Sequence, residues 1–229
     1  MRRSAWIWLG ILSCAACLAT GCGSSSSGSL TNAQVRFVMA SPDAPQVNIL
    51  VDGVVQAGDL SYGNASTYIS VTPKSHTIQA APVSGGAAIF DQNITFASSS
   101  NQTLLLTGPA ASIQTVMLDD TSPTAEVGDA FVRVVNASAT MGAADVYIVP
   151  AGSGIAGVMP VTAGLAFNQS TGYQLTVAGN YQVFMTSPGT SNALLNTGPI
   201  SLVASQNQTV VVLDGAAAGT FTFAPLPDQ

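Results

Sequence analysis

An internal repeat constrains the fold of this chain more than any other feature of its sequence. Three segments of the first half return in the second half, in the same order and with matching residue types. The pairs are residues 35–41 with 132–138, 66–68 with 170–173, and 101–106 with 207–212. A repeat of this length indicates tandem domains rather than a solenoid. We therefore predict one domain over residues 33–122 and a related domain over residues 130–229.

Short apolar runs separated by turn residues predict strands throughout both copies. In the first copy we expect strands at residues 35–40, 47–51, 68–71, 76–81, 87–96, 102–107 and 113–118. In the second we expect them at 131–136, 145–149, 173–177, 181–186, 200–204, 208–213 and 220–223. Asp52-Gly53 is typical of a two-residue hairpin turn. About seven strands per copy and no helical period predict an all-β protein of two tandem immunoglobulin-like antiparallel β-sandwiches. The uninterrupted apolar runs 104–106 and 210–212 indicate strands buried between two layers.

The charge composition excludes several classes of partner. Only 7% of the residues are charged, and beyond the first 21 residues the basic ones are Arg36, Lys74 and Arg133. Eleven acidic residues oppose them. A surface of this kind repels phosphate backbones, so we expect no nucleic-acid binding.

The opening of the first copy resembles a known family. The segments 35–45 and 47–53, followed by 60–68, are similar to the start of a bacterial cell-surface family known as domain of unknown function 4397. The second copy departs from this pattern at residues 139–142, where Pro-Asp-Ala-Pro would be expected. The resemblance implies a sandwich domain of secreted or anchored proteins. It implies no catalytic residues.

The N-terminus resembles that of bacterial lipoproteins. Arg2 and Arg3 precede an apolar stretch shorter than the ~20 residues that a membrane-spanning helix needs. Gly21 and Cys22 then match a lipobox, which implies a signal peptide over 1–21, lipidation at Cys22 and a Gly/Ser-rich tether over 22–32. An ordinary signal peptide that happens to contain cysteine is the alternative. Because Gly23 follows the cysteine, the resemblance favours the outer membrane over the inner membrane.

Catalytic, cofactor and metal sites are not predicted anywhere. His76 is the only histidine, and we interpret it as a surface or edge-strand residue. Residues 152–157 spell Gly-x-Gly-x-x-Gly, but Pro160 interrupts the helix that a dinucleotide site requires, so we expect a loop. A zinc site needs three or four suitable ligands, and no such cluster occurs in the sequence.

Three weaker signals leave alternatives open. Asp119, Asp120, Glu126 and Asp129 surround the predicted domain junction. These carboxylates could bind calcium, but a solvated linker is the plainer interpretation. Tyr62, Tyr68 and Tyr173 could contact a glycan, but packing is the plainer interpretation. Asn93 lies in an acidic sequon and is a candidate for glycosylation.

We therefore expect a lipid-anchored envelope protein that serves as a non-enzymatic surface binding or structural module. Its expected partners are the membrane, through the lipid, and a protein or glycan at the cell surface. The alternative is a hydrolase, or an accessory subunit of one, that acts on envelope or extracellular polysaccharide.

Overall fold

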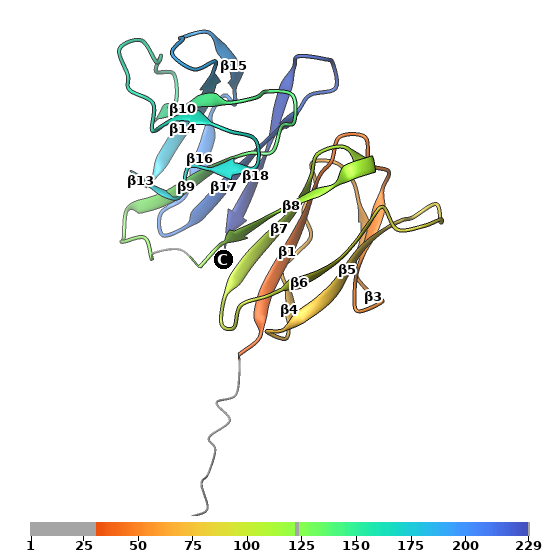
Figure 1. Cartoon of the computed structure of the whole chain (residues 1–229). Coiled ribbons are helices and arrows are strands. Elements are labelled where there is room, and N and C mark those ends of the chain that lie inside the picture. Colours follow the sequence, from red (N-terminus) through yellow and green to blue (C-terminus); the bar gives the residue numbers. More distant parts are fainter. Residues whose placement is uncertain (1–30, 122–123, 229) are drawn as a thin grey trace, which may run out of the picture.

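The strands form two β-sandwiches, each of two sheets (Figure 1). The structure is a computed structural model that describes residues 31–121 and 124–228. All its elements are strands except a short 3-10 turn, η1 (Ala110–Ser112). The predicted all-β sandwich fold is confirmed. Among the described residues no helix is long and apolar enough to cross a membrane.

The first sandwich contains strands β1 to β8. The sheet that faces the other sandwich, called the inner sheet, has the order β4-β1-β7-β8. The sheet on the far side, called the outer sheet, has the order β3-β2-β5-β6. The bounds are β1 Ala33–Ala40, β2 Val47–Val51, β3 Val54–Leu60, β4 Ile69–Val71, β5 Ser75–Pro82, β6 Phe90–Thr95, β7 Asn101–Thr107 and β8 Gln114–Asp119. At the β2–β3 hairpin, Asp52 and Gly53 have φ values of 51° and 79°. This left-handed backbone confirms the predicted turn.

The second sandwich contains strands β9 to β18. Its inner sheet has the order β12-β9-β17-β18, with β13 also paired to β9, and its outer sheet has the order β11-β10-β14-β15, with β16 paired to β14. The bounds are β9 Asp129–Asn136, β10 Ala144–Pro150, β11 Thr162–Leu165, β12 Gln169–Ser170, β13 Gln174–Val177, β14 Gly179–Thr186, β15 Ala193–Asn196, β16 Ile200–Leu202, β17 Asn207–Asp214 and β18 Phe221–Asp228.

Sequence patterns missed β11, β12 and β15, and ended the last strand too early. All three missed strands are short. The last strand was expected to end at residue 223, but β18 continues to Asp228 through Pro225 and Pro227. Proline is compatible with an edge strand when its position needs no ladder donor. One pair in each inner sheet, β1 with β7 and β9 with β17, runs parallel, and the other pairs are antiparallel.

The two inner sheets pack against each other, so the molecule has four layers of sheet. One apolar core fills each sandwich, and a third lies between the sandwiches. On β7, Leu104 and Leu106 face the first core, whereas Leu105 faces the third. On β17, Val210 and Val212 face the second core and Val211 the third. Burial on both faces explains the uninterrupted apolar runs in the sequence.

Candidate functional site

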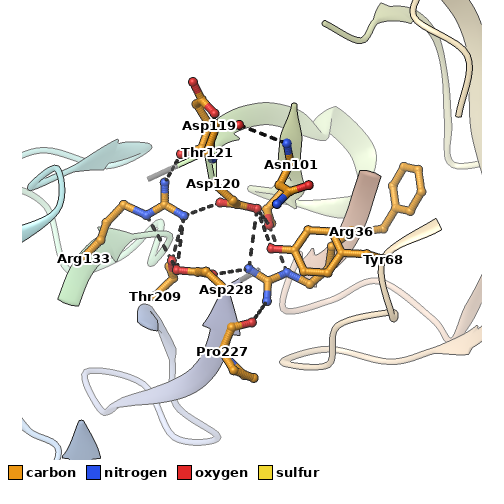
Figure 2. A network of polar contacts seen from close by, with 12 residues as sticks. Arg36, Tyr68, Asn101, Asp119, Asp120, Thr121, Arg133, Thr209, Pro227 and Asp228 are labelled. Carbon is orange, nitrogen blue, oxygen red and sulfur yellow. Dashed lines mark hydrogen bonds and ion pairs between the residues drawn. The ribbon is translucent and has the colours of Figure 1, made fainter. Parts of the chain in front are cut away.

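The junction between the sandwiches holds a buried network of charges. We define the junction network as Arg36, Asp120, Arg133 and Asp228 together with the side chains that hydrogen-bond to them (Figure 2). The four charged side chains are between 0% and 4% exposed. The two arginines occupy the same position of β1 and β9, where each lies opposite a threonine of the parallel neighbour strand.

The arginines and aspartates pair across the junction. Arg36 of the first sandwich donates to Asp228 Oδ1 of the second at 2.6 Å and to the Pro227 carbonyl at 2.7 Å. Arg133 of the second sandwich donates in turn to Asp120 of the first, and to the Asp119 carbonyl at 2.9 Å. Each arginine lies 3.8 Å from the other aspartate. The four charges therefore sum to zero and connect the two halves reciprocally.

Threonine and tyrosine side chains complete the network in matched pairs. Thr103 and Thr209 each accept a hydrogen bond from an arginine Nε at 3.0 Å and donate to an aspartate. The Tyr68 hydroxyl donates to Asp120 at 2.8 Å, and the Tyr173 hydroxyl donates to Asp228 at 2.8 Å. The arginine carbons lie 4.7 Å and 4.4 Å from the centroids of these tyrosine rings. Cation–π contact therefore adds to the charge pairing.

The same surroundings keep the tyrosines protonated. Burial, assisted by the charge of Asp120, raises the pKa of Tyr68 well above its ordinary value. Burial also raises the pKa of Tyr173, although the nearby Arg133 opposes this effect. Both phenols therefore remain hydrogen-bond donors over the physiological range of pH.

A groove opens at one edge of this junction, with a cavity volume of about 740 Å³. One wall is the segment 63–68, and the other is β18 from Phe223 to Asp228. Arg36 and Asp228, which are paired with each other, lie at the base. A volume of this size suits a small molecule or a short polymer segment.

The opposite edge of the junction is built from equivalent residues but is bridged by side chains. Gly63 N donates to the carbonyl of Met39, and Asn168 N donates to the carbonyl of Asn136, which holds the same place in β9. Asn168 is thus the counterpart of Gly63. Its Nδ2 donates to Gln114 Oε1 at 2.9 Å and so reaches across to β8. Gly63 has no side chain with which to make this bridge, and its edge stays open.

The predicted site residues have different outcomes. Cys22 and the tether up to residue 30 lie outside the described residues, so lipidation stays a prediction. Asp119 and Glu126 are exposed, as a solvated linker predicts. For Asp120 that interpretation is wrong, because its side chain is 0% exposed and is bound by Arg133. Among residues 31–121 and 124–228 no group of three or more His, Cys, Asp or Glu could hold a metal ion.

His76 is buried, so its interpretation as a surface or edge-strand residue is wrong. It is 5% exposed and lies on β5, which has neighbours on both sides. Its Nδ1 is 2.7 Å from Asp52 Oδ2, and its Nε2 is 2.9 Å from the Thr72 carbonyl. The hydrogen bond with His76, followed by one from the Thr77 backbone, holds the pKa of Asp52 below its ordinary value. His76 thus fastens the β2–β3 turn to the β4–β5 connection.

Several other residues singled out by the sequence have structural roles. The carboxylate of Asp43, from the Pro-Asp-Ala-Pro motif, accepts a hydrogen bond from Ala110 N at 2.7 Å. In the second sandwich the roles of the two loops are reversed. Asp214, at the end of β17, accepts a hydrogen bond at 3.1 Å from Ala139 N, in the segment that lacks the Pro-Asp-Ala-Pro motif. Ile155 of the glycine-rich loop packs on Tyr147 and Val149. Asn93 is exposed on β6, and its glycosylation stays a prediction.

Sequence reasoning missed the junction network, although the sequence carried a signal for it. Two of the three basic residues beyond the predicted signal peptide, Arg36 and Arg133, recur at one position of the repeat within otherwise apolar strands. A Leu-x-Asp pattern also recurs, at 118–120 and 226–228. Charges at fixed positions of buried strands indicate pairing, because isolated buried charges are too costly.

Fold and junction together define an all-β protein of two sandwiches joined through a buried, charge-paired face. The chain belongs to the family described as Domain of unknown function (DUF4397), whose profile matches residues 33–147, just over half of the sequence. The match covers the first sandwich and continues through β9 into β10.

Two further comparisons add little to this assignment. A search of curated proteins gave no match. Among solved structures, one described as "Alpha-glucan recognition by family 41 carbohydrate-binding modules from streptococcal virulence factors" is similar at 11% identity and a TM-score of 0.27. That likeness covers 84% of this chain and 97% of the other.

Proposed function

We propose that this protein is a lipid-anchored, non-enzymatic binding module of the cell envelope that works through the groove at its junction. The observation that carries the proposal is the open groove of about 740 Å³ on a base of paired charges. Arg36 and Asp228 bind each other there, so the charge at the base of the groove is balanced. The four-layer packing makes the groove a preformed site, which lowers the entropy cost of binding.

The second sandwich is, in this proposal, a diverged second copy of the family domain. Support comes from the matched positions of Arg36 and Arg133, Thr103 and Thr209, and Tyr68 and Tyr173. Each pair makes equivalent contacts on opposite sides of the junction. A tandem duplication explains this reciprocity more simply than chance does.

The anchor in this proposal is the lipidated Cys22. Because β1 begins at Ala33, the intervening tether would have a root-mean-square reach of roughly 17–20 Å. The groove would then stay close to the membrane, and the outer membrane is the proposed location. Cys22→Ala should move the protein from the membrane fraction to the soluble fraction while its thermal midpoint stays unchanged. Retention of the variant in membranes would contradict the anchor.

A photo-crosslinking amino acid tests the binding role. Thr67 is exposed in the groove wall, and Gln169 is exposed at the opposite edge of the junction, so Gln169 serves as the comparison position. On intact cells the probe at Thr67 should give a saturable adduct with one envelope component, whereas the probe at Gln169 should not. Equal adducts at both positions, or none at either, would overturn the groove as the binding site. Turnover of peptidoglycan or polysaccharide by the purified protein would contradict the non-enzymatic role.

A further inference from the structure

The edge of β18 that faces the groove offers hydrogen-bond acceptors and almost no donors. In an antiparallel ladder alternate residues direct both backbone groups toward the partner strand, and the others direct them away. The Pro227 carbonyl accepts from Arg36 rather than from β17, so Pro227 is one of the outward residues. Phe223 and Pro225 are then outward as well, because they follow the same alternation.

Two prolines remove the donors from this edge. Pro225 and Pro227 have no N–H, so Phe223 supplies the one backbone donor among these three outward residues. The carbonyls of Phe223 and Pro225 are acceptors that Arg36 does not use. Within the described part of the chain, no backbone hydrogen bond from outside the β17–β18 ladder reaches either of these two carbonyls. A ligand that lies along this wall must therefore supply most of the donors.

The opposite wall is polar and uncharged. Asn64 and Thr67 are both exposed there, and each can donate and accept. The only charges that line the groove are Arg36 and Asp228, which pair at 2.6 Å. A charged ligand would lose water at the groove without gaining an unpaired counter-charge. The lining therefore favours a neutral ligand.

Apolar surface alternates with these polar groups. The groove is also lined by the exposed ring of Pro225 and by Phe223 and Tyr68, of which Phe223 also packs on the second core and Tyr68 on Arg36. A sugar ring carries hydroxyl donors at its rim and C–H groups on its faces, and this combination fits an acceptor row beside apolar rings. An extended peptide fits less well, because strand addition needs N–H donors that the two prolines do not have.

We propose that the groove binds a neutral oligosaccharide, with sugar hydroxyls donating to the carbonyls of Phe223 and Pro225 and bonding to Asn64 and Thr67. This inference rests on the proposed function, because it names the ligand class of that same groove. The ligand is identified by chemistry alone: an uncharged, hydroxyl-rich chain of a few sugar units.

A defined panel of probes tests the ligand class. Purified protein is titrated by calorimetry with neutral oligomers of four to six units (glucose, mannose, galactose and N-acetylglucosamine), with uronic-acid oligomers of the same length, and with a proline-free extended peptide. At least one neutral oligomer should bind, and the acidic oligomers and the peptide should bind at least tenfold more weakly. Tighter binding of an acidic oligomer or of the peptide would overturn the inference. Failure of every neutral oligomer would also overturn it.

Two variants place the binding in the groove. Asn64→Ala should weaken binding about fivefold, the effect of one lost hydrogen bond. Thr67→Arg should weaken it more than tenfold, because a large cation would fill the space beside a neutral ligand. The matched controls Gln169→Ala and Gln169→Arg alter an exposed side chain at the opposite edge and should change nothing. If binding survives Thr67→Arg, or if Gln169→Arg weakens it equally, the groove is not the sugar-binding site.

The two proposals can fail separately. A saturable adduct at Thr67 with an envelope protein, together with no binding of any oligosaccharide, would leave the binding role standing and overturn the ligand class. Absence of both the adduct and the oligosaccharide binding would overturn both proposals.

Discussion

The two edges of the junction are formed by equivalent residues, but one edge is open and the other is bridged by side chains. At the groove edge, Gly63 and the proline-containing β18 leave a cavity of about 740 Å³. At the bridged edge, the counterpart residue Asn168 reaches Gln114 of β8 with a hydrogen bond of 2.9 Å. The buried arginine and aspartate pairs are nearly the same at both edges. A frame whose positions recur in both sandwiches can therefore keep its stabilising core while a few rim residues decide which side is open.

The largest expected effect is a loss of stability that differs between Asp120 and Asp228. Asp120→Ala should destabilise the protein by about 3–5 kcal/mol, because the buried Arg133 would lose its directly bound carboxylate and keep only Asp228, 3.8 Å away. Asp228→Ala should cost less, since both residues line the groove and removal of the carboxylate would open Arg36 to water from it. Chemical denaturation of both variants measures the difference. Equal losses would mean that the open edge does not relieve the unpaired charge.

Proline substitution tests the backbone direction of the two edge strands. Asp120 N donates to the Asn101 carbonyl, so N–H groups at even positions of β8 face β7 and that of Met117 faces away. Met117→Pro, which copies Pro225 of β18, should cost about 1 kcal/mol or less. Val116→Pro should cost about 1–3 kcal/mol more than Met117→Pro, because it removes a ladder donor and leaves its acceptor on β7 unpaired. If the two variants are equally destabilised in urea, the assigned alternation is wrong.

Placing the counterpart residue at Gly63 should close the groove edge. Gly63 has φ +78°, and a Cβ there would lie 3.5 Å from Leu213 Cδ1, an ordinary contact. Its counterpart Asn168 adopts φ 64°, so asparagine tolerates this backbone. Gly63→Asn should lower oligosaccharide affinity, or the yield of the Thr67 adduct, at least tenfold without a change in fold. The control Asn168→Gly should leave both readouts unchanged.

The smallest expected effect concerns Tyr62, whose hydroxyl donates to the Asp214 carbonyl at 2.9 Å. Phe167 occupies the equivalent place in the other sandwich, near Gly108, and has no hydroxyl. Tyr62→Phe should therefore cost only about 1 kcal/mol at neutral pH.

The pH dependence of this variant supplies a second measurement. Burial raises the pKa of Tyr62 to about 12, so its contribution to stability is complete below about pH 10 and is lost as the pH rises through about 12. In Tyr62→Phe this loss should be smaller. Absorbance titration near 295 nm should also lose one phenol that ionises near pH 12. An unchanged titration curve would contradict the assignment.

Much of the fold could be predicted because its signals are local. Alternating apolar runs and the Asp52-Gly53 turn depend on neighbouring residues, and they identified most strands. The missed strands β11, β12 and β15 span only two to four residues, and too few side chains lie in each to form a pattern. Pro225 and Pro227 ended the last predicted strand early, because sequence alone does not say that β18 is an edge.

The site was harder to predict because its residues meet only through the tertiary packing. Arg36 and Asp228 are 192 positions apart, and no local pattern brings them together. His76 was placed at the surface because a lone polar residue at a strand entry usually lies there. Its buried state depends on Asp52 and Thr72, which approach from two different loops. The open groove beside Gly63 could be recognised only in the structure, by comparison with the edge that Asn168 bridges.

The reciprocal pairing of Arg36 with Asp228 also sets an order of assembly. The first sandwich can form from contacts within β1 to β8, but its inner face and Arg36 lack their partners until β18 is in place. Closing so long a loop is slow compared with forming hairpins. Until then the half-folded chain would display an apolar face on which Arg36 has only Asp120, 3.8 Å away, to balance its charge. That intermediate is the form a chaperone would recognise and a protease would remove.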